Sequence, residues 1–358
     1  MSTPFISILQ LLTAFQCLLF TAFLVIARDR ARSGNAALGM MLVLLAMQLL
    51  ALAAQQAELL APGATPVSTF GFLYGPLFYF YVRAQIERHA PFRRRTLVHA
   101  IPFILSVTAW LIYPLPPNIL TVGTLLSVGL YLSACFVRLT RYRQIIAGTR
   151  SETHSISLRW LYTATAGWSW VFLLYLGAYT LDFFQPWSRT VYAWTLLFLV
   201  LLVFVNAFVF AALRHPRLFS GISPEDEQIV ASLSAVRRRT MPTDEDLQVA
   251  ARIQATMHQD QLYLQPELTL AELAAALNLA PRSVSEVINL YFKQNFAEFI
   301  NSYRIEAAKR RLLAEETRDE SILELLYAVG FNSKSTFNAA FKLKTGLSPS
   351  QYRTRGPS

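Results

Sequence analysis

The sequence predicts an all-α fold in two parts, an N-terminal seven-helix transmembrane bundle and a C-terminal pair of helix-turn-helix units. Three observations predict this fold. The composition is 54% hydrophobic and only 15% charged, whereas soluble domains carry roughly 25% charged residues. Long apolar stretches fill the first 213 residues, and two segments with helix-turn-helix spacing lie in the last hundred.

Seven apolar stretches account for the predicted bundle. They lie at about 5–27, 36–56, 67–85, 97–113, 119–137, 160–181 and 190–213. Most approach the roughly 20 residues that a helix needs to cross a bilayer. The third is short and contains Gly71, Gly75 and Pro76, so it could kink. A soluble protein with buried apolar helices would need a polar outer shell, and these stretches offer almost none.

The distribution of arginine predicts how the bundle is oriented. Residues 1–213 hold 14 Lys/Arg and five acids. Counted over alternate loops, 13 of the basic residues fall on one side and one on the other. Because short cytoplasmic loops are enriched in Lys and Arg, seven spans place the N-terminus outside and the chain after Leu213 inside. We therefore expect a multi-pass membrane protein with its C-terminal part in the cytoplasm.

The sequence contains no motif that indicates enzyme chemistry. No charged residue lies deep within a stretch, no metal-binding or nucleotide-binding motif occurs, and the two cysteines are best explained as small hydrophobic residues. The sequence thus predicts no catalytic, cofactor or metal site. Gln16, Gln48, Gln55 and Asn206 are expected to form interhelical hydrogen bonds rather than ligand contacts.

Residues 214–261 form a polar linker for which two interpretations stay open. Ser223 with Pro224, and Thr243 with three acids after it, are typical helix starts. An apolar stripe then follows. Its members are Leu247, Ala250, Ile253 and Met257. The second helix either packs on the next domain or is a dimerising or signal-carrying helix. Arg237–Arg239 are solvated or lie near lipid headgroups or DNA.

The first helix-turn-helix unit is predicted at about 269–291. Thr269 and Glu272 have the spacing of a capping box. Asn278 stands where a tight turn needs a left-handed backbone, and Pro281 can open the second helix. The apolar positions expected to pack are Leu273, Ala274, Leu277, Val284, Val287 and Ile288. This spacing is that of a helix-turn-helix motif.

The second unit is predicted at about 321–343. Gly330 supplies the turn, and Phe331, Phe337 and Phe341 supply the core. Lys334, Asn338 and Lys342 follow one another at intervals of four, so they should share the opposite face. A long helix at 295–316 joins the two units, and Ser348 with Pro349 starts a terminal helix.

Residues 262–354 resemble the DNA-binding domain of the AraC/XylS family of bacterial transcription regulators. The resemblance rests on "LTLAELAAALNLAPRSVSEVIN", "NFAEFINSYRIEAAKRRLL" and "VGFNSKSTFNAAFKLKTGLSPSQYR". It implies two helix-turn-helix units that read adjacent segments of the DNA major groove. The whole chain is similar to the membrane-anchored branch of this family, which implies a multi-pass protein of the bacterial inner membrane. The residues assigned to DNA binding are Arg282, Ser283, Ser285, Glu286, Asn289, Ser333, Lys334, Ser335, Thr336, Asn338 and Lys342.

Two positions depart from the family pattern. Leu326 stands where a small residue is usual before the turn glycine, and Ala339 replaces a longer polar side chain. The first departure questions the packing of the second unit, and the second predicts fewer base contacts there. Charge nevertheless favours DNA, since 281–311 holds six basic and three acidic residues and 325–358 holds five basic and none acidic.

We therefore expect a membrane-embedded, sequence-specific DNA-binding transcription regulator, not an enzyme. Double-stranded DNA and the lipid bilayer are its expected partners. A homodimer through 214–261 or the bundle, a small-molecule or membrane-protein signal and RNA polymerase are further expected partners. The alternatives are a transporter or membrane receptor with a regulatory tail, and a helix-turn-helix tail that binds protein instead of DNA.

Overall fold

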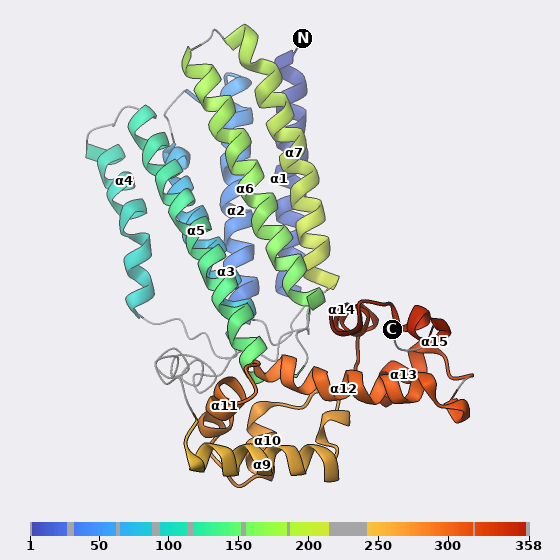
Figure 1. The fold of residues 1–358 in the computed structure, drawn as a ribbon. Coiled ribbons are helices and arrows are strands. Elements are labelled where there is room, and N and C mark those ends of the chain that lie inside the picture. The colour runs from blue at the N-terminus through green and yellow to red at the C-terminus, as the bar shows by residue number, and fades with distance from the viewer. Residues whose placement is uncertain are drawn as a thin grey trace. The chain divides into compact units, whose positions relative to one another are not determined.

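The computed structural model describes residues 2–26, 32–61, 65–87, 94–112, 117–151, 155–184, 187–214, 242–317 and 319–355. All the regular elements of these ranges are helical, as the sequence predicts (Figure 1). The chain divides into two compact units. The first comprises Met1–Thr140 and Ile156–Gly221, and the second comprises Arg141–Ser155 and Ile222–Ser358.

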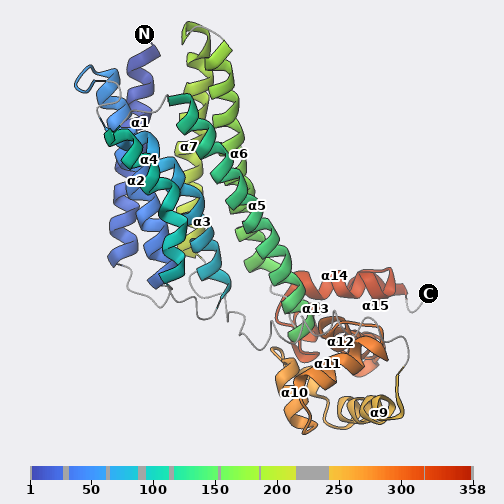
Figure 2. The same ribbon diagram turned by 90° about the vertical axis from the view of Figure 1, so that its left-hand side faces the viewer.

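The first unit is a set of long helices that run alongside one another (Figures 1 and 2). Its helices are α1 (Ser2–Ile26), α2 (Arg32–Gln56), α3 (Gly71–Ile86), α4 (Ile101–Ile112), the greater part of α5 (Pro117–Thr149), α6 (Ser155–Phe184) and α7 (Trp187–Arg214), with the short 3₁₀ helices η1 (Pro66–Phe70) and η2 (Arg94–Ala100). Helix α1 packs against α2 and α7, and α2 packs against α3.

Four helices in the described ranges are long and apolar enough to cross a membrane. They are Pro4–Ile26, Gly34–Gln56, Ile119–Thr149 and Val191–Ala211. The prediction of seven spans is therefore wrong in number. Helices α3 and α4 have 16 and 12 residues, fewer than the roughly 20 that a span needs. Helix α6 has 30 residues but is less apolar, because Thr, Ser, Trp, Tyr and Gly are interspersed along it.

Gln16, Gln48 and Asn206 form hydrogen bonds across helices of the first compact unit, as predicted. The side-chain amide of Asn206 in α7 donates to Oε1 of Gln16 in α1 at 2.5 Å. The Tyr74 hydroxyl of α3 donates to Oε1 of Gln48 in α2. Such pairs satisfy polar groups that would otherwise be costly in an apolar surrounding.

The second unit is built from short helices. They are α9 (Asp244–Gln259), the 3₁₀ helix η3 (Leu262–Leu264), α10 (Leu270–Ala276), α11 (Pro281–Leu290), α12 (Phe296–Leu313), the 3₁₀ helix η4 (Glu315–Thr317), α13 (Ile322–Ala328), α14 (Lys334–Thr345) and α15 (Pro349–Arg355). Capping boxes open α9, α10, α12 and α13, where a Thr, Asn or Ser pairs reciprocally with an acid three residues later. Each box satisfies amides at the helix start that have no intrahelical partner.

Helix α9 packs into the core of the second unit. Val249, Ala250, Ile253 and Met257 are buried in the same hydrophobic cluster as α10 to α14. Leu247, which the sequence placed in this stripe, is 45% exposed instead, and Val249 is buried in its place. This arrangement favours the interpretation of a helix packed on its own domain. The predicted helix start at Ser223 and the Arg237–Arg239 cluster lie outside the described residues.

Candidate nucleic-acid interface

Helices α10 and α11 form the first helix-turn-helix unit. The Thr269 hydroxyl accepts from the Glu272 amide at 3.2 Å, and the Glu272 carboxylate accepts from the Thr269 amide at 2.7 Å. Asn278 in the turn has φ +51°, and Pro281 is the first residue of α11. The predicted capping box, left-handed turn and proline start are all confirmed.

The inner face of α11 is apolar and fixes which residues face outward. Val284, Val287 and Ile288 are buried, with exposed fractions of 2% or less, and Ala274 of α10 is fully buried opposite them. A small side chain at Ala274 lets the two helices approach closely. The outward row of α11 then begins at Arg282 and continues through Glu286, because residues four apart are neighbours on one helix face.

The predicted site residues of α11 are in different surroundings. Arg282 and Ser283 are exposed, and the Arg282 guanidinium pairs with the Glu286 carboxylate at 2.8 Å. Asn289 is half-buried, and its amide donates to the Ser285 carbonyl oxygen at 2.8 Å. Ser285 is only 1% exposed, and its hydroxyl has no hydrogen-bond partner among the described residues. Nucleic acid could reach Arg282 and Ser283 directly, but not Ser285 in this conformation.

Helices α13 and α14 form the second helix-turn-helix unit. Gly330 in its turn has φ +90°, and a Cβ built there would lie 2.7 Å from the carbonyl oxygens of Tyr263 and Leu264. Glycine is therefore required at this position both by backbone conformation and by space. Leu326 is fully buried in the core cluster, so the larger side chain at this position is accommodated.

Helix α14 carries an open polar face. Phe331, Phe337 and Phe341 are fully buried, as predicted. Lys334, Ser335 and Lys342 are exposed, whereas Ser333, Thr336 and Asn338 are half-buried. The Ser333 hydroxyl caps the helix by accepting from the Thr336 amide at 3.4 Å, and it also contacts the Ser335 hydroxyl at 3.0 Å.

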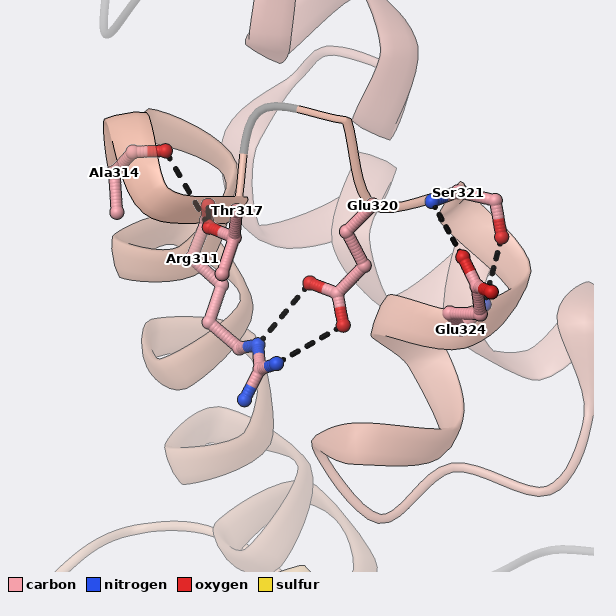
Figure 3. Close-up of polar contacts among 6 residues, drawn as sticks. All are labelled: Arg311, Ala314, Thr317, Glu320, Ser321 and Glu324. Atoms are coloured by element: carbon pink, nitrogen blue, oxygen red, sulfur yellow. Dashed lines mark hydrogen bonds and ion pairs between the residues drawn. The ribbon is translucent and has the colours of Figure 1, made fainter.

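The junction between α12 and α13 connects the two units. The Arg311 guanidinium donates to both carboxylate oxygens of Glu320, at 2.9 and 3.2 Å (Figure 3). The Thr317 hydroxyl donates to the Arg311 carbonyl oxygen. The Ser321 amide donates to the Glu324 carboxylate at 2.9 Å, and the Glu324 amide donates to the Ser321 hydroxyl at 3.1 Å (Figure 3). These contacts fix where α13 begins, and hence where α14 lies relative to α12.

Arg304 of α12 is a structural residue that the sequence did not reveal. Its side chain is fully buried and donates to the carbonyl oxygens of Tyr263 and Gln265 at 2.7 and 2.6 Å. Its guanidinium also lies over the Phe331 ring, 5.5 Å from the centroid. Arg304 therefore joins the loop before α10 to the core of the second unit, but a sequence containing many arginines gives no signal that marks this one.

Comparisons with known proteins agree with this architecture. Residues 273–355 match a helix-turn-helix domain family. The C-terminal unit therefore carries a helix-turn-helix domain. The chain is 29% identical over 159 residues to YijO, an uncharacterised HTH-type transcriptional regulator of Escherichia coli (strain K12). The match covers 40% of this chain and 54% of that protein. No solved structure matches the chain.

The charge of the domain is divided between its parts. No acidic residue occurs from 325 to 358, which includes α14 and α15, whereas Glu315, Glu316, Asp319, Glu320 and Glu324 gather at the junction. Among the described residues, no cluster of three His, Cys, Asp or Glu could hold a metal ion. The α14 face can therefore offer cations to a polyanion without competing acids of its own segment.

Proposed function

We propose that the protein is a membrane-anchored, sequence-specific DNA-binding transcription regulator. The observation that carries this proposal is the second helix-turn-helix unit, in which α14 exposes Lys334, Ser335 and Lys342 on a segment without acids. The second helix of such a motif enters the major groove with its N-terminal residues at the base edges. The likeness to an HTH-type transcriptional regulator supports the same conclusion.

The proposed DNA contacts divide by chemistry. Arg282 and Lys334 begin their helices and can reach guanine edges or phosphates. Ser283, Ser333, Ser335 and Thr336 can bond phosphate oxygens, and Asn289 and Asn338 have amides suited to adenine. Lys342 lies two turns further along α14 and suits a backbone phosphate. Ser285 and Glu286 can join them only if α11 becomes more exposed than it is here.

The four long apolar helices indicate a membrane protein, and we propose that they anchor the helix-turn-helix domain at the cytoplasmic face of the bacterial inner membrane. Arg214 and Arg217, at and just after the end of α7, support this orientation. A reporter fused after Ser220 should be active only in the cytoplasm. A periplasmic signal from that fusion would contradict the proposed orientation.

Selection of bound duplexes from a random pool tests DNA reading. We expect the full-length protein in lipid nanodiscs to enrich a defined sequence. Lys334→Ala and Arg282→Ala should each weaken binding, by about 1–3 kcal/mol where the side chain contacts a base. Arg310→Ala removes the same charge from an exposed position on α12 and should change binding little.

Enrichment of no sequence, with equal affinity of all three variants for bulk DNA, would contradict the proposal. That outcome would favour the alternative in which the helix-turn-helix domain binds protein. Loss of binding in all three variants alike would indicate general electrostatic attraction without sequence reading.

A further inference from the structure

The last turns of α5 belong to the second compact unit of the chain, although the helix begins in the first compact unit. The candidate membrane span of α5 runs over 31 residues, Ile119–Thr149, whereas about 20 residues cross a bilayer. Some ten residues therefore extend beyond the apolar layer, beginning near Arg138, Arg141 and Arg143. Arginines commonly mark the cytoplasmic end of a span.

The extension is amphipathic and one of its faces is covered. Tyr142, Ile145, Ile146 and Thr149 are 4%, 2%, 7% and 4% exposed. Arg141, Arg143 and Gln144 are exposed. The covered residues recur at the spacing of one helix face, so this face packs against protein.

The chain just after α5 is bonded to the helix-turn-helix domain. The Ser151 amide donates to the Leu268 carbonyl oxygen at 3.0 Å, and Arg150 forms an isolated antiparallel bridge with Thr269. The buried Arg304 guanidinium donates to the Ser151 hydroxyl at 3.2 Å. Residues 150 and 151 are thus fixed at the start of α10 and against α12.

The outward row of α11 is increasingly covered toward its C-terminal end. The Arg282 side chain is 62% exposed, the Glu286 side chain 21%, and Leu290 only 7%. Leu290, and Ala297 at the start of α12, are buried but lie outside the hydrophobic cluster that forms the core of the unit. Something other than that core therefore covers them, and both views show the end of α5 beside α11 and α12 (Figures 1 and 2).

Helix α14 offers an internal comparison. Leu290 follows the buried pair Val284 and Ile288 by two residues, and Leu343 follows Phe337 and Phe341 in the same way. Leu343 is 90% exposed, whereas Leu290 is 7% exposed. The same residue at the same helical position is open in one unit and covered in the other.

We propose that the end of α5, Arg141–Ser151, is an autoinhibitory segment that covers the Ser285–Leu290 side of α11 and keeps the first helix-turn-helix unit from DNA. The major groove is about 12 Å wide, and one helix with its side chains is about 10–12 Å across. Helix α11 therefore cannot enter the groove with a second helix along its outer side. Because α5 is one continuous helix, movement of its membrane-embedded part uncovers α11. This inference rests on the proposed function.

A disulfide tests the docking and its effect together. Residues facing each other across an antiparallel bridge have Cα atoms about 4.5–5.5 Å apart, within the range for a disulfide. We therefore expect Arg150→Cys/Thr269→Cys, in a Cys17→Ala/Cys135→Ala background, to crosslink in membranes. The oxidised protein should bind a selected duplex at least tenfold more weakly than the same protein after reduction. Arg150→Cys/Ser321→Cys places the second cysteine at the matching cap of the second unit and should not crosslink.

A second pair of variants releases the segment instead. Ile146→Asp places a charge on the covered face, and we expect it to raise DNA affinity at least tenfold and to increase amide exchange in α11. Gln144→Asp adds the same charge on the exposed face and should change neither. Equal affinity of oxidised and reduced protein, tighter binding when crosslinked, or absence of the crosslink would overturn the inference. If the crosslink forms but no variant binds any duplex, the proposed function fails instead.

Discussion

The two helix-turn-helix units share one construction but differ in how their turns are made and how far their second helices are exposed. Both begin with a capping box, at Thr269 and at Ser321. The first turn uses Asn278 at φ +51°, whereas the second uses Gly330 at φ +90° against two carbonyl oxygens. Helix α11 is covered near Leu290, and α14 is open at Leu343.

This difference shows that the fold of a helix-turn-helix unit and the exposure of its second helix have different causes. Capping, turn conformation and the buried pairs of α11 and α14 are local and are present in both units. Exposure of the outer face depends on what else packs against it, which differs between them. We therefore expect the second helix-turn-helix unit to contact DNA first.

Substitution of the turn residues should change the free energy of unfolding most strongly. Gly330→Ala would force a Cβ toward two carbonyl oxygens in a left-handed conformation, so we expect a loss of roughly 1–3 kcal/mol or more in folding free energy. Denaturant unfolding of the full chain, followed by hydrogen exchange across α13 and α14, measures it. Asn278→Gly should cost far less, since glycine adopts φ +51° freely. Equal losses would remove the distinction between the turns.

The matching positions one residue after each buried pair should differ in DNA binding. Lys342 of α14 is exposed, whereas the Asn289 amide of α11 is engaged with the Ser285 carbonyl. Lys342→Ala should therefore reduce the slope of log affinity against log salt by about 1, while Asn289→Ala leaves the slope unchanged. Fluorescence anisotropy over a salt series measures both. An unchanged slope for Lys342→Ala would argue against α14 as the leading contact.

The junction between the units should matter more for spacing than for stability. The Arg311–Glu320 pair is partly exposed, with 42% and 15% of the side chains accessible, so Arg311→Ala should cost no more than about 1 kcal/mol. We expect it to relax the preferred distance between two half-sites in selected duplexes. Lys309→Ala, which breaks a pair with Glu306 inside α12, is the matched control and should leave the spacing preference intact.

The smallest effect concerns pH at the start of α13. Hydrogen bonds from the Ser321 hydroxyl and amide lower the pKa of Glu324 below its usual 4.5. A lowered pKa means that the ionised carboxylate stabilises the helix start above pH 4.5, and that this contribution is lost as pH falls through the folded-state pKa. Protection of the amides at the start of α13, relative to their intrinsic exchange rates, should accordingly fall below pH 4.5. Glu324→Gln keeps a capping side chain and should remove this pH dependence.

Local chemistry made much of the C-terminal unit predictable. The Thr269 box, Asn278, Gly330 and the buried phenylalanines follow from spacing and backbone conformation, which neighbouring residues decide. The apolar stretches predicted helices in the first unit, but not their bounds. Within the described ranges, four of them are long and apolar enough to span, not seven, because α3 and α4 are short and α6 is rich in Thr, Ser and aromatic residues.

The environments that depend on distant contacts could not be predicted. Ser285 has the sequence position of a DNA-reading residue but is 1% exposed. Arg304 has the sequence context of a solvated arginine but bonds to carbonyl oxygens some 40 residues earlier. Neither neighbouring residues nor helical periodicity carries information about such partners, so only the folded chain identifies them.

Genome-wide mapping of the sites bound by the full-length, membrane-embedded protein tests the central claim most directly, with a parallel blot for cleavage. We expect a small set of sites that share one sequence and are lost in Lys334→Ala but retained in Arg310→Ala. No enrichment over a strain lacking the protein, with the intact chain present in the membrane, would contradict a DNA-binding regulator.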